Sequence, residues 1–126
     1  MENLMKKTIF LILMVFSLYG QKVFVACEGN FYQENGSLWT INEGLAYEFG
    51  NNPIGETVQS LYVHLDELFV IVNGSHNIQV FDIEENSLTL KQLIDTNNSG
   101  PREMLIYNDY LYFSNWYSSD IKKLDL

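Results

Sequence analysis

The chain has 126 residues, with 16 acidic and 7 basic side chains and a formal net charge of −9. Such acidity repels phosphate backbones, and no basic patch with interleaved aromatic residues occurs, so we expect no nucleic-acid partner. A single cysteine excludes an intrachain disulfide. A requirement for solubility explains the negative charge without a specific cation.

The N-terminal residues have the layout of a secretory signal peptide. Lys6 and Lys7 form a basic region, and an apolar run of twelve residues extends from Thr8 to Tyr19. The run is shorter than the roughly 20 apolar residues that a permanent span needs. We therefore predict that residues 1–20 are cleaved, that no stable transmembrane span remains, and that the protein is periplasmic, secreted or at the cell surface. An uncleaved N-terminal anchor is the alternative.

The next segment, Phe24 to Cys27, permits two interpretations. It loosely matches the box that precedes a lipidated cysteine in bacterial lipoproteins, but Lys22 would then interrupt the apolar stretch. It equally matches a β-strand whose free cysteine behaves as a small buried hydrophobe. We favour the buried strand and keep lipidation of Cys27 as the alternative.

The rest of the chain indicates an all-β fold. Runs of four to seven residues rich in Tyr, Phe, Val and Ile are separated by turn-forming dipeptides. Asn35-Gly36 and Asn73-Gly74 are strong hairpin signals, because both residue types tolerate positive φ angles. No segment after the predicted signal peptide carries a sustained apolar stripe of helical period.

A repeat with a period of 43 residues organises the strands. The segment Val58–Ile83 aligns without a gap with Pro101–Leu126. The identical pairs are Asp66/Asp109, Leu68/Leu111, Ser75/Ser118, Ile78/Ile121 and Asp82/Asp125. A period in the low forties, made of short strands, is typical of the four-stranded antiparallel blades of β-propellers.

The strand predictions divide the chain into three units. In chain order the predicted strands are Phe24–Cys27, Ser37–Asn42, Ser60–His64, Glu67–Val72, Asn77–Ile83, Thr89–Ile94, Glu103–Tyr107, Tyr110–Asn115 and Asp120–Leu126. We expect a partial first blade in residues 21–57, a full blade in 58–100 and an incomplete blade in 101–126. Residues 21–126 would then form a partial β-propeller, an incomplete ring of two to three blades.

Three stretches carry a resemblance to a known family. Leu111–Asn115 (LYFSN) stands at the position of a Tyr-Val-Thr-Asn motif, Leu68–Asn73 is a degenerate copy, and Cys27–Phe31 matches the opening of some members. In these stretches the chain resembles the YVTN-repeat, YncE-like β-propellers of exported bacterial proteins. The resemblance implies a complete ring, of which this chain is an N-terminal fragment with its signal peptide. If the chain is truly this short, we expect self-association.

The residues offer no catalytic set. His64 and His76 are the only histidines, and they lack the i, i+4 spacing of a helical metal pair. There is no Gly-rich phosphate loop and no nucleophile elbow. The oxygen-rich segment Asp95–Ser99 can be interpreted as a Ca²⁺ loop, but it lacks the spaced carboxylates of an EF-hand, so an ordinary loop is preferred. We predict no catalytic residue, no metal ligand and no cofactor.

A weak ligand site is predicted where the innermost strands begin. In the propellers that the chain resembles, these strands line the channel, and Arg102 and Glu103 open that strand in the last repeat, with Gln59 one repeat earlier. Arg102 can bind a carboxylate or phosphate through its fork of donors, but an ion pair, either local with Glu103 or between blades, is favoured. Trp116, beside Asn115, is either an exposed recognition aromatic or a packing residue, and packing is favoured.

Three functions fit this sequence. The favoured one is an exported, non-enzymatic β-propeller module of the bacterial cell envelope that binds an unidentified protein or small molecule. A propeller enzyme, lactonase-like or quinone-dependent, is the second, with its catalytic residues in other blades. A surface-layer or envelope structural component is the third.

Overall fold

The computed structural model describes residues 22–126, which form ten β-strands and no helix. The all-β prediction is therefore confirmed for this part of the chain. The predicted signal peptide, residues 1–20, lies outside the described residues. Residues 22–126 contain no helix that is long and apolar enough to cross a membrane.

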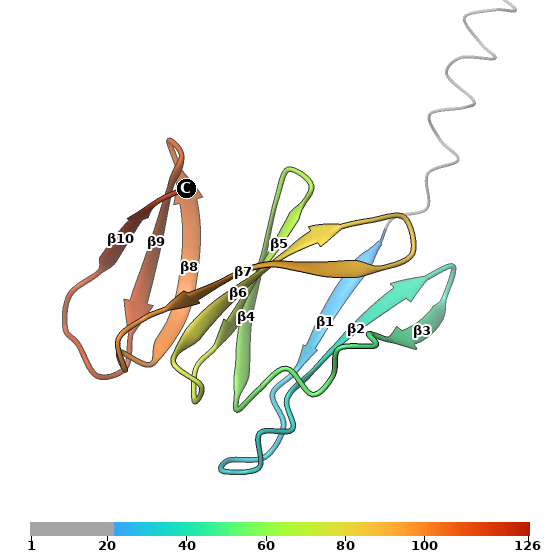
Figure 1. Cartoon of the computed structure of the whole chain (residues 1–126), viewed down its shortest axis with the longest axis horizontal. Coiled ribbons are helices and arrows are strands. Elements are labelled where there is room, and N and C mark those ends of the chain that lie inside the picture. The colour runs from blue at the N-terminus through green and yellow to red at the C-terminus, as the bar shows by residue number, and fades with distance from the viewer. Residues whose placement is uncertain (1–21) are drawn as a thin grey trace, which may run out of the picture.

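The strands form three antiparallel sheets in which every strand pairs with its neighbour in sequence (Figure 1). The N-terminal sheet contains β1 (Val23–Cys27), β2 (Ser37–Asn42) and β3 (Leu45–Glu48). The central sheet contains β4 (Val58–His64), β5 (Glu67–Val72), β6 (Asn77–Ile83) and β7 (Leu88–Asp95). The C-terminal sheet contains β8 (Pro101–Tyr107), β9 (Tyr110–Asn115) and β10 (Lys122–Asp125).

The sheets lie in chain order and pack face to face, and the described residues do not close a ring (Figure 1). In each sheet we call the side toward the start of the chain the N-facing side and the opposite side the C-facing side. The central sheet is covered on both sides. Its strand β5 is accordingly a continuous apolar run, Leu68 to Val72, in which every residue is at most 1% exposed.

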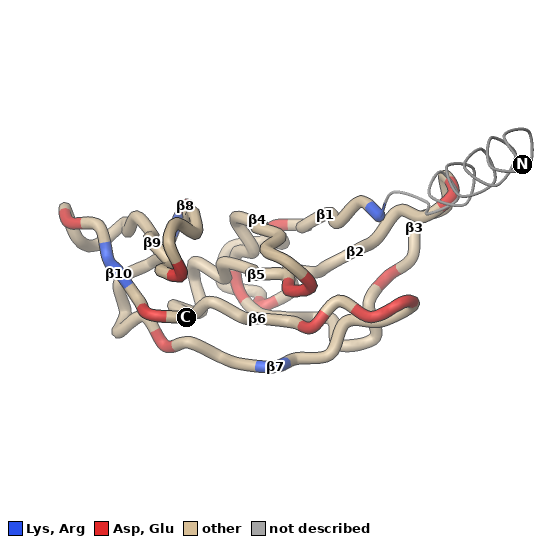
Figure 2. The backbone as a smooth tube through the Cα atoms, turned by 90° about the horizontal axis from the view of Figure 1, so that it is seen from above, with Lys and Arg blue, Asp and Glu red and all other residues tan. Residues whose placement is uncertain are grey.

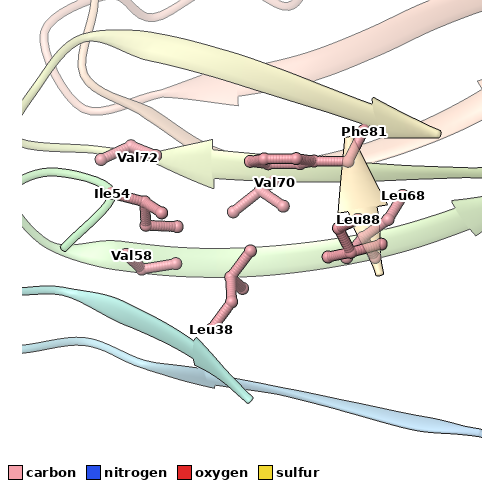
Figure 3. Packing of buried hydrophobic residues seen from close by; sticks show 8 residues of the cluster. All are labelled: Leu38, Ile54, Val58, Leu68, Val70, Val72, Phe81 and Leu88. Carbon is pink, nitrogen blue, oxygen red and sulfur yellow. The ribbon is translucent and has the colours of Figure 1, made fainter. Parts of the chain in front are cut away.

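The N-terminal core fills the space between the N-terminal and central sheets. Alternate residues of β5, namely Leu68, Val70 and Val72, point to this side, because successive side chains of a strand alternate between faces. Figure 3 shows Leu38 of β2 reaching toward them. The remaining buried members of the core are Ile54, Val58, Phe81 and Leu88.

The C-terminal core fills the space between the central and C-terminal sheets. Phe69 and Ile71, the other alternating residues of β5, pack here with Leu111 and Phe113 of β9. Ile78 and Val80 of β6 complete its buried members. One short strand therefore contributes to both cores, which makes β5 the centre of the described fold.

The hydrogen bonds between neighbouring repeats recur with the sequence period. Asn73 N donates to Thr57 O at 2.8 Å, and 43 positions later Trp116 N donates to Gly100 O at 2.7 Å. Each of these two hydrogen bonds joins the residue after a sheet's second strand to the residue before that sheet's first strand. A second pair repeats in the same way, Gly74 N to Glu56 O with Tyr117 N to Ser99 O. Within single repeats, Ile83 N to Asp66 O and Leu126 N to Asp109 O also correspond. The gap-free alignment of the two copies is thus reproduced by three corresponding pairs of hydrogen bonds.

Two strand-level expectations need correction. The strand β3 was not predicted, because all four of its residues are exposed and it carries no apolar alternation. Cys27 lies at the end of a strand, as expected, but it is exposed instead of buried. Its side of the N-terminal sheet has no cover within residues 22–126, whereas the equivalent side of the central sheet is covered.

The acidic residues are spread over all three sheets (Figure 2).

Candidate functional site

The first strands of the central and C-terminal sheets place most of the predicted ligand residues together. Gln59 lies on β4, Arg102 and Glu103 lie on β8, and the two strands are in contact. Trp116 follows the end of β9. The 43-residue period explains the proximity of Gln59 and Arg102, since equivalent positions of adjacent stacked sheets lie next to each other along the stack.

Arg102 is held by one amide and one aromatic ring. With the Gln59 amide turned so that its oxygen faces the guanidinium, that oxygen accepts from Arg102 Nε at 3.1 Å and from Nη2 at 2.9 Å. The guanidinium carbon lies 4.6 Å from the centroid of the Trp116 ring, within the range of a cation–π contact. Two of the five guanidinium N–H groups are thereby used. The other three have no hydrogen-bond partner among residues 22–126.

Glu103 does not pair with Arg102. Its Oε2 accepts a hydrogen bond from Ser60 Oγ at 2.9 Å, again between residues 43 positions apart, and its backbone N donates to Ser114 Oγ at 3.3 Å. Within the described part of the chain no ion pair involves Arg102. The predicted ion pair, with Glu103 or between blades, is therefore not formed among residues 22–126, and the two contacts of the guanidinium are with neutral groups.

Trp116 is 54% exposed, and the next residue, Tyr117, is 72% exposed. Tyr117 stacks beside it with ring centroids 6.5 Å apart and an interplanar angle of 21°, and His76 lies 5.9 Å beyond. The sequence interpretation favoured packing for Trp116, but more than half of its side chain is accessible. Tyr117 was not among the predicted ligand residues, although it follows Trp116 directly in the sequence. We call Gln59, Arg102, Trp116 and Tyr117 the arginine–aromatic cluster.

The histidine next to this cluster has a structural role. His76 Nδ1 accepts from the backbone N of Gly100 at 3.1 Å, and its own carbonyl accepts from Thr96 Oγ1 at 2.7 Å. Both contacts fasten the β5–β6 hairpin to the linker before β8. His76 therefore positions the segment from which Arg102 starts.

Asn115 is bonded within its own hairpin. Its Nδ2 donates to the carbonyl of Asp120 at 3.1 Å, and its Oδ1 is buried without a partner among residues 22–126. Lys122 Nζ donates to Asp120 Oδ2 at 2.9 Å, and this hydrogen bond lowers the pKa of the Asp120 carboxyl. Asn115 thus braces the hairpin that carries Trp116 and does not join the arginine–aromatic cluster.

A polar cavity of about 300 Å³ lies next to the cluster. The loop after β7 forms one wall, and Tyr117, Lys122 and Lys123 contribute to the rest. In this loop Asn97 N donates to Asp95 Oδ1 at 2.8 Å, so one carboxylate oxygen is used by its own turn. A larger cavity of about 420 Å³ lies between the N-terminal sheet and the β6–β7 hairpin, and it contains none of the predicted ligand residues.

The described residues hold no group of three or more His, Cys, Asp or Glu side chains that could hold a metal ion. The chemistry that the arginine–aromatic cluster offers is binding by a fixed positive charge, N–H donors and two exposed rings. No protein-family model matches the chain, and a search of curated proteins finds no match either.

Proposed function

We propose that the chain belongs to an exported β-propeller and serves as a binding module for anionic ligands, with the arginine–aromatic cluster as its binding site. The propeller assignment rests on the 43-residue period and on consecutive antiparallel meanders that pack face to face. The export assignment rests on the signal-like pattern of residues 1–20.

The observation that carries the binding proposal is the state of Arg102. Its guanidinium is fixed between Gln59 and Trp116, so little side-chain entropy is lost when a ligand binds. Three N–H donors remain for a carboxylate or phosphate, and a planar fork matches both groups. Lys122 and Lys123 line the adjoining cavity, but Lys122 pairs with Asp120 and the cavity also contains Asp95, so Arg102 is the group that supplies the positive charge.

The exposed rings indicate which acids fit best. Trp116 and Tyr117 present flat apolar surface beside the charge, so a ligand with a ring next to its acid group gains stacking in addition to the ion pair. Benzoate is therefore the preferred probe, and inorganic phosphate is the probe for charge alone.

The fluorescence of Trp116 provides the test. A Trp39→Phe variant leaves Trp116 as the only tryptophan, because the chain has two. Titration with benzoate is expected to change its emission with saturation. Arg102→Gln should weaken binding about ten- to hundredfold, since hydrogen bonds to a charged group contribute about 1.5–3 kcal/mol. Arg102→Lys should lose less, because the charge remains without the fork.

Lys91→Gln is the matched control for loss of a positive charge. Lys91 lies on β7 and pairs with Glu67, outside the arginine–aromatic cluster. Its replacement should leave the benzoate titration unchanged. If Arg102→Gln and Lys91→Gln lower the affinity equally, binding follows net charge alone and the proposed site is wrong.

A further inference from the structure

Two apolar sheet sides have no cover within residues 22–126. The C-facing side of the C-terminal sheet presents Leu105, Tyr107 and Ile121, which are 51%, 63% and 71% exposed. The N-facing side of the N-terminal sheet presents Val23 and Ile41, which are 45% and 37% exposed. These two sides lie at opposite ends of the row of sheets (Figure 1).

The repeat relates the first of these sides to a buried interface. Tyr112 and Ile121 stand 43 positions after Phe69 and Ile78, which are 1% and 0% exposed in the C-terminal core. In the central sheet these positions are covered by the next sheet along the chain. The C-facing side of the C-terminal sheet therefore has the pattern of a surface that another sheet covers.

Strand register relates the second side to the other buried interface. Val25 pairs with Trp39 across β1 and β2, as Val70 pairs with Gln79 across β5 and β6. By this register Val23, Val25 and Cys27 occupy the positions of Leu68, Val70 and Val72, which are each 0% exposed in the N-terminal core. In the central sheet these positions are covered by the preceding sheet.

The chain thus carries, on two different sheets, the two halves of an interface that it already forms twice internally. We propose that the C-facing side of the C-terminal sheet of one copy packs on the N-facing side of the N-terminal sheet of a second copy. Such a contact is heterologous, because it joins two different surfaces. It continues the row of sheets from one copy into the next.

The proposed interface is weaker than the internal ones. Ser114 and Lys123 stand where the central sheet has Ile71 and Val80, so the exposed side has fewer apolar groups than its buried counterpart. The Lys123 ammonium lies 3.5 Å from the centroid of the Tyr110 ring, which keeps its charge next to aromatic surface. We therefore expect reversible association that depends on protein concentration.

Complementary substitutions test both the contact and its polarity. Leu105→Glu places a charge on one side and leaves the other side intact, and Ile41→Glu does the reverse. The full sequence is expressed in cells, and the purified product is studied by sedimentation, whether or not the cells have removed residues 1–20. For the wild-type chain we expect oligomers that grow with protein concentration. Each variant alone should be monomeric, and an equimolar mixture should form a dimer, because only one complementary pair of sides remains.

Second variants guard against local unfolding. Tyr107→Glu and Val23→Glu alter the same two sides at other positions and should repeat the result, with circular dichroism reporting an intact β fold. A monomeric wild-type chain would overturn the proposal. So would a mixture that stays monomeric. An Ile41→Glu chain that still self-associates while Leu105→Glu does not would indicate a symmetric contact of the C-terminal sheet and would equally contradict the head-to-tail arrangement.

Discussion

The central sheet and the two outer sheets are built from closely related strands but differ in how much of them is buried. Ile78 of the central sheet is 0% exposed, whereas Ile121, the same residue type 43 positions later in the C-terminal sheet unit, is 71% exposed. The two residues occupy equivalent positions of the repeat. The difference shows that in a row of stacked sheets the burial of a residue is decided by the neighbouring sheet and not by its own strand.

The largest effect on the free energy of unfolding is expected from truncating a side chain that is buried between two sheets. Phe69→Ala should lower the free energy of unfolding by about 3–5 kcal/mol, because it leaves a cavity in the C-terminal core. Tyr112→Ala, 43 positions later on the uncovered side, should cost about 1 kcal/mol at concentrations where the chain is monomeric. Urea unfolding of both variants provides the measurement. Equal losses would contradict the difference between the sheets.

A smaller effect is expected from the polar tie between the central and C-terminal sheets. Asn73 is 6% exposed, and its Nδ2 donates to the carbonyl of Pro101 at 2.8 Å. Asn73→Ala leaves this buried carbonyl without a donor and should cost about 1–3 kcal/mol in thermal or urea unfolding. The exposed Asn51 provides the control, and Asn51→Ala should change stability by less than about 0.5 kcal/mol. If Asn73→Ala loses no more stability than Asn51→Ala, the hydrogen bond from Asn73 to Pro101 does not stabilise the contact between the two sheets.

The smallest effect is expected at the β6–β7 hairpin, where even the central sheet is open to solvent. Ser87 Oγ and Thr89 Oγ1 donate to the Glu84 carboxylate at 2.5 and 2.9 Å, which lowers its pKa below 4.5. The lowered pKa means that the folded state favours the ionised form. The resulting stabilisation is present above the pKa of the unfolded chain and is lost as pH falls through the pKa of the folded state.

Glu84→Gln should therefore destabilise the chain slightly at neutral pH, and this difference should disappear in acid. Glu85→Gln removes a neighbouring charge that makes no described side-chain hydrogen bond, and it should give no such pH dependence. Thermal unfolding between neutral pH and pH 3 compares the two variants. A difference between wild type and Glu84→Gln that is constant over this range would contradict the role of the hydroxyl donors.

Local pattern predicted much of the fold. Strands β2, β5, β6 and β9 begin and end where the apolar runs and turn residues indicated. At Asn108 and Asp109 both φ angles are positive, as the tight turn between β8 and β9 requires. Such features depend on a few adjacent residues. The two Asn-Gly signals were less accurate, because neither Gly36 nor Gly74 has a positive φ angle and Gly36 forms a β-bridge with Gly55.

Features that depend on contacts between sheets were less predictable. Cys27 was predicted to be buried, because the residue pattern of its strand is that of a strand in a covered sheet. In the structure this side of the sheet is uncovered and Cys27 is exposed. The period placed Gln59 beside Arg102, but the stacking of Trp116 on the guanidinium depends on the course of its hairpin. Asn115 was grouped with the site because it is adjacent in sequence, although its side chain is directed to Asp120.

The pairing of each strand only with its sequence neighbours has a consequence for folding kinetics. Every hairpin closes a short segment of chain, so β-structure can form locally, on the microsecond timescale of isolated hairpins. Contacts between successive sheets join residues about one repeat apart, and they form only after the hairpins exist. The rate-limiting step is then expected to be the packing of preformed sheets against each other. Because β5 contributes side chains to both cores, both of these packing steps involve β5.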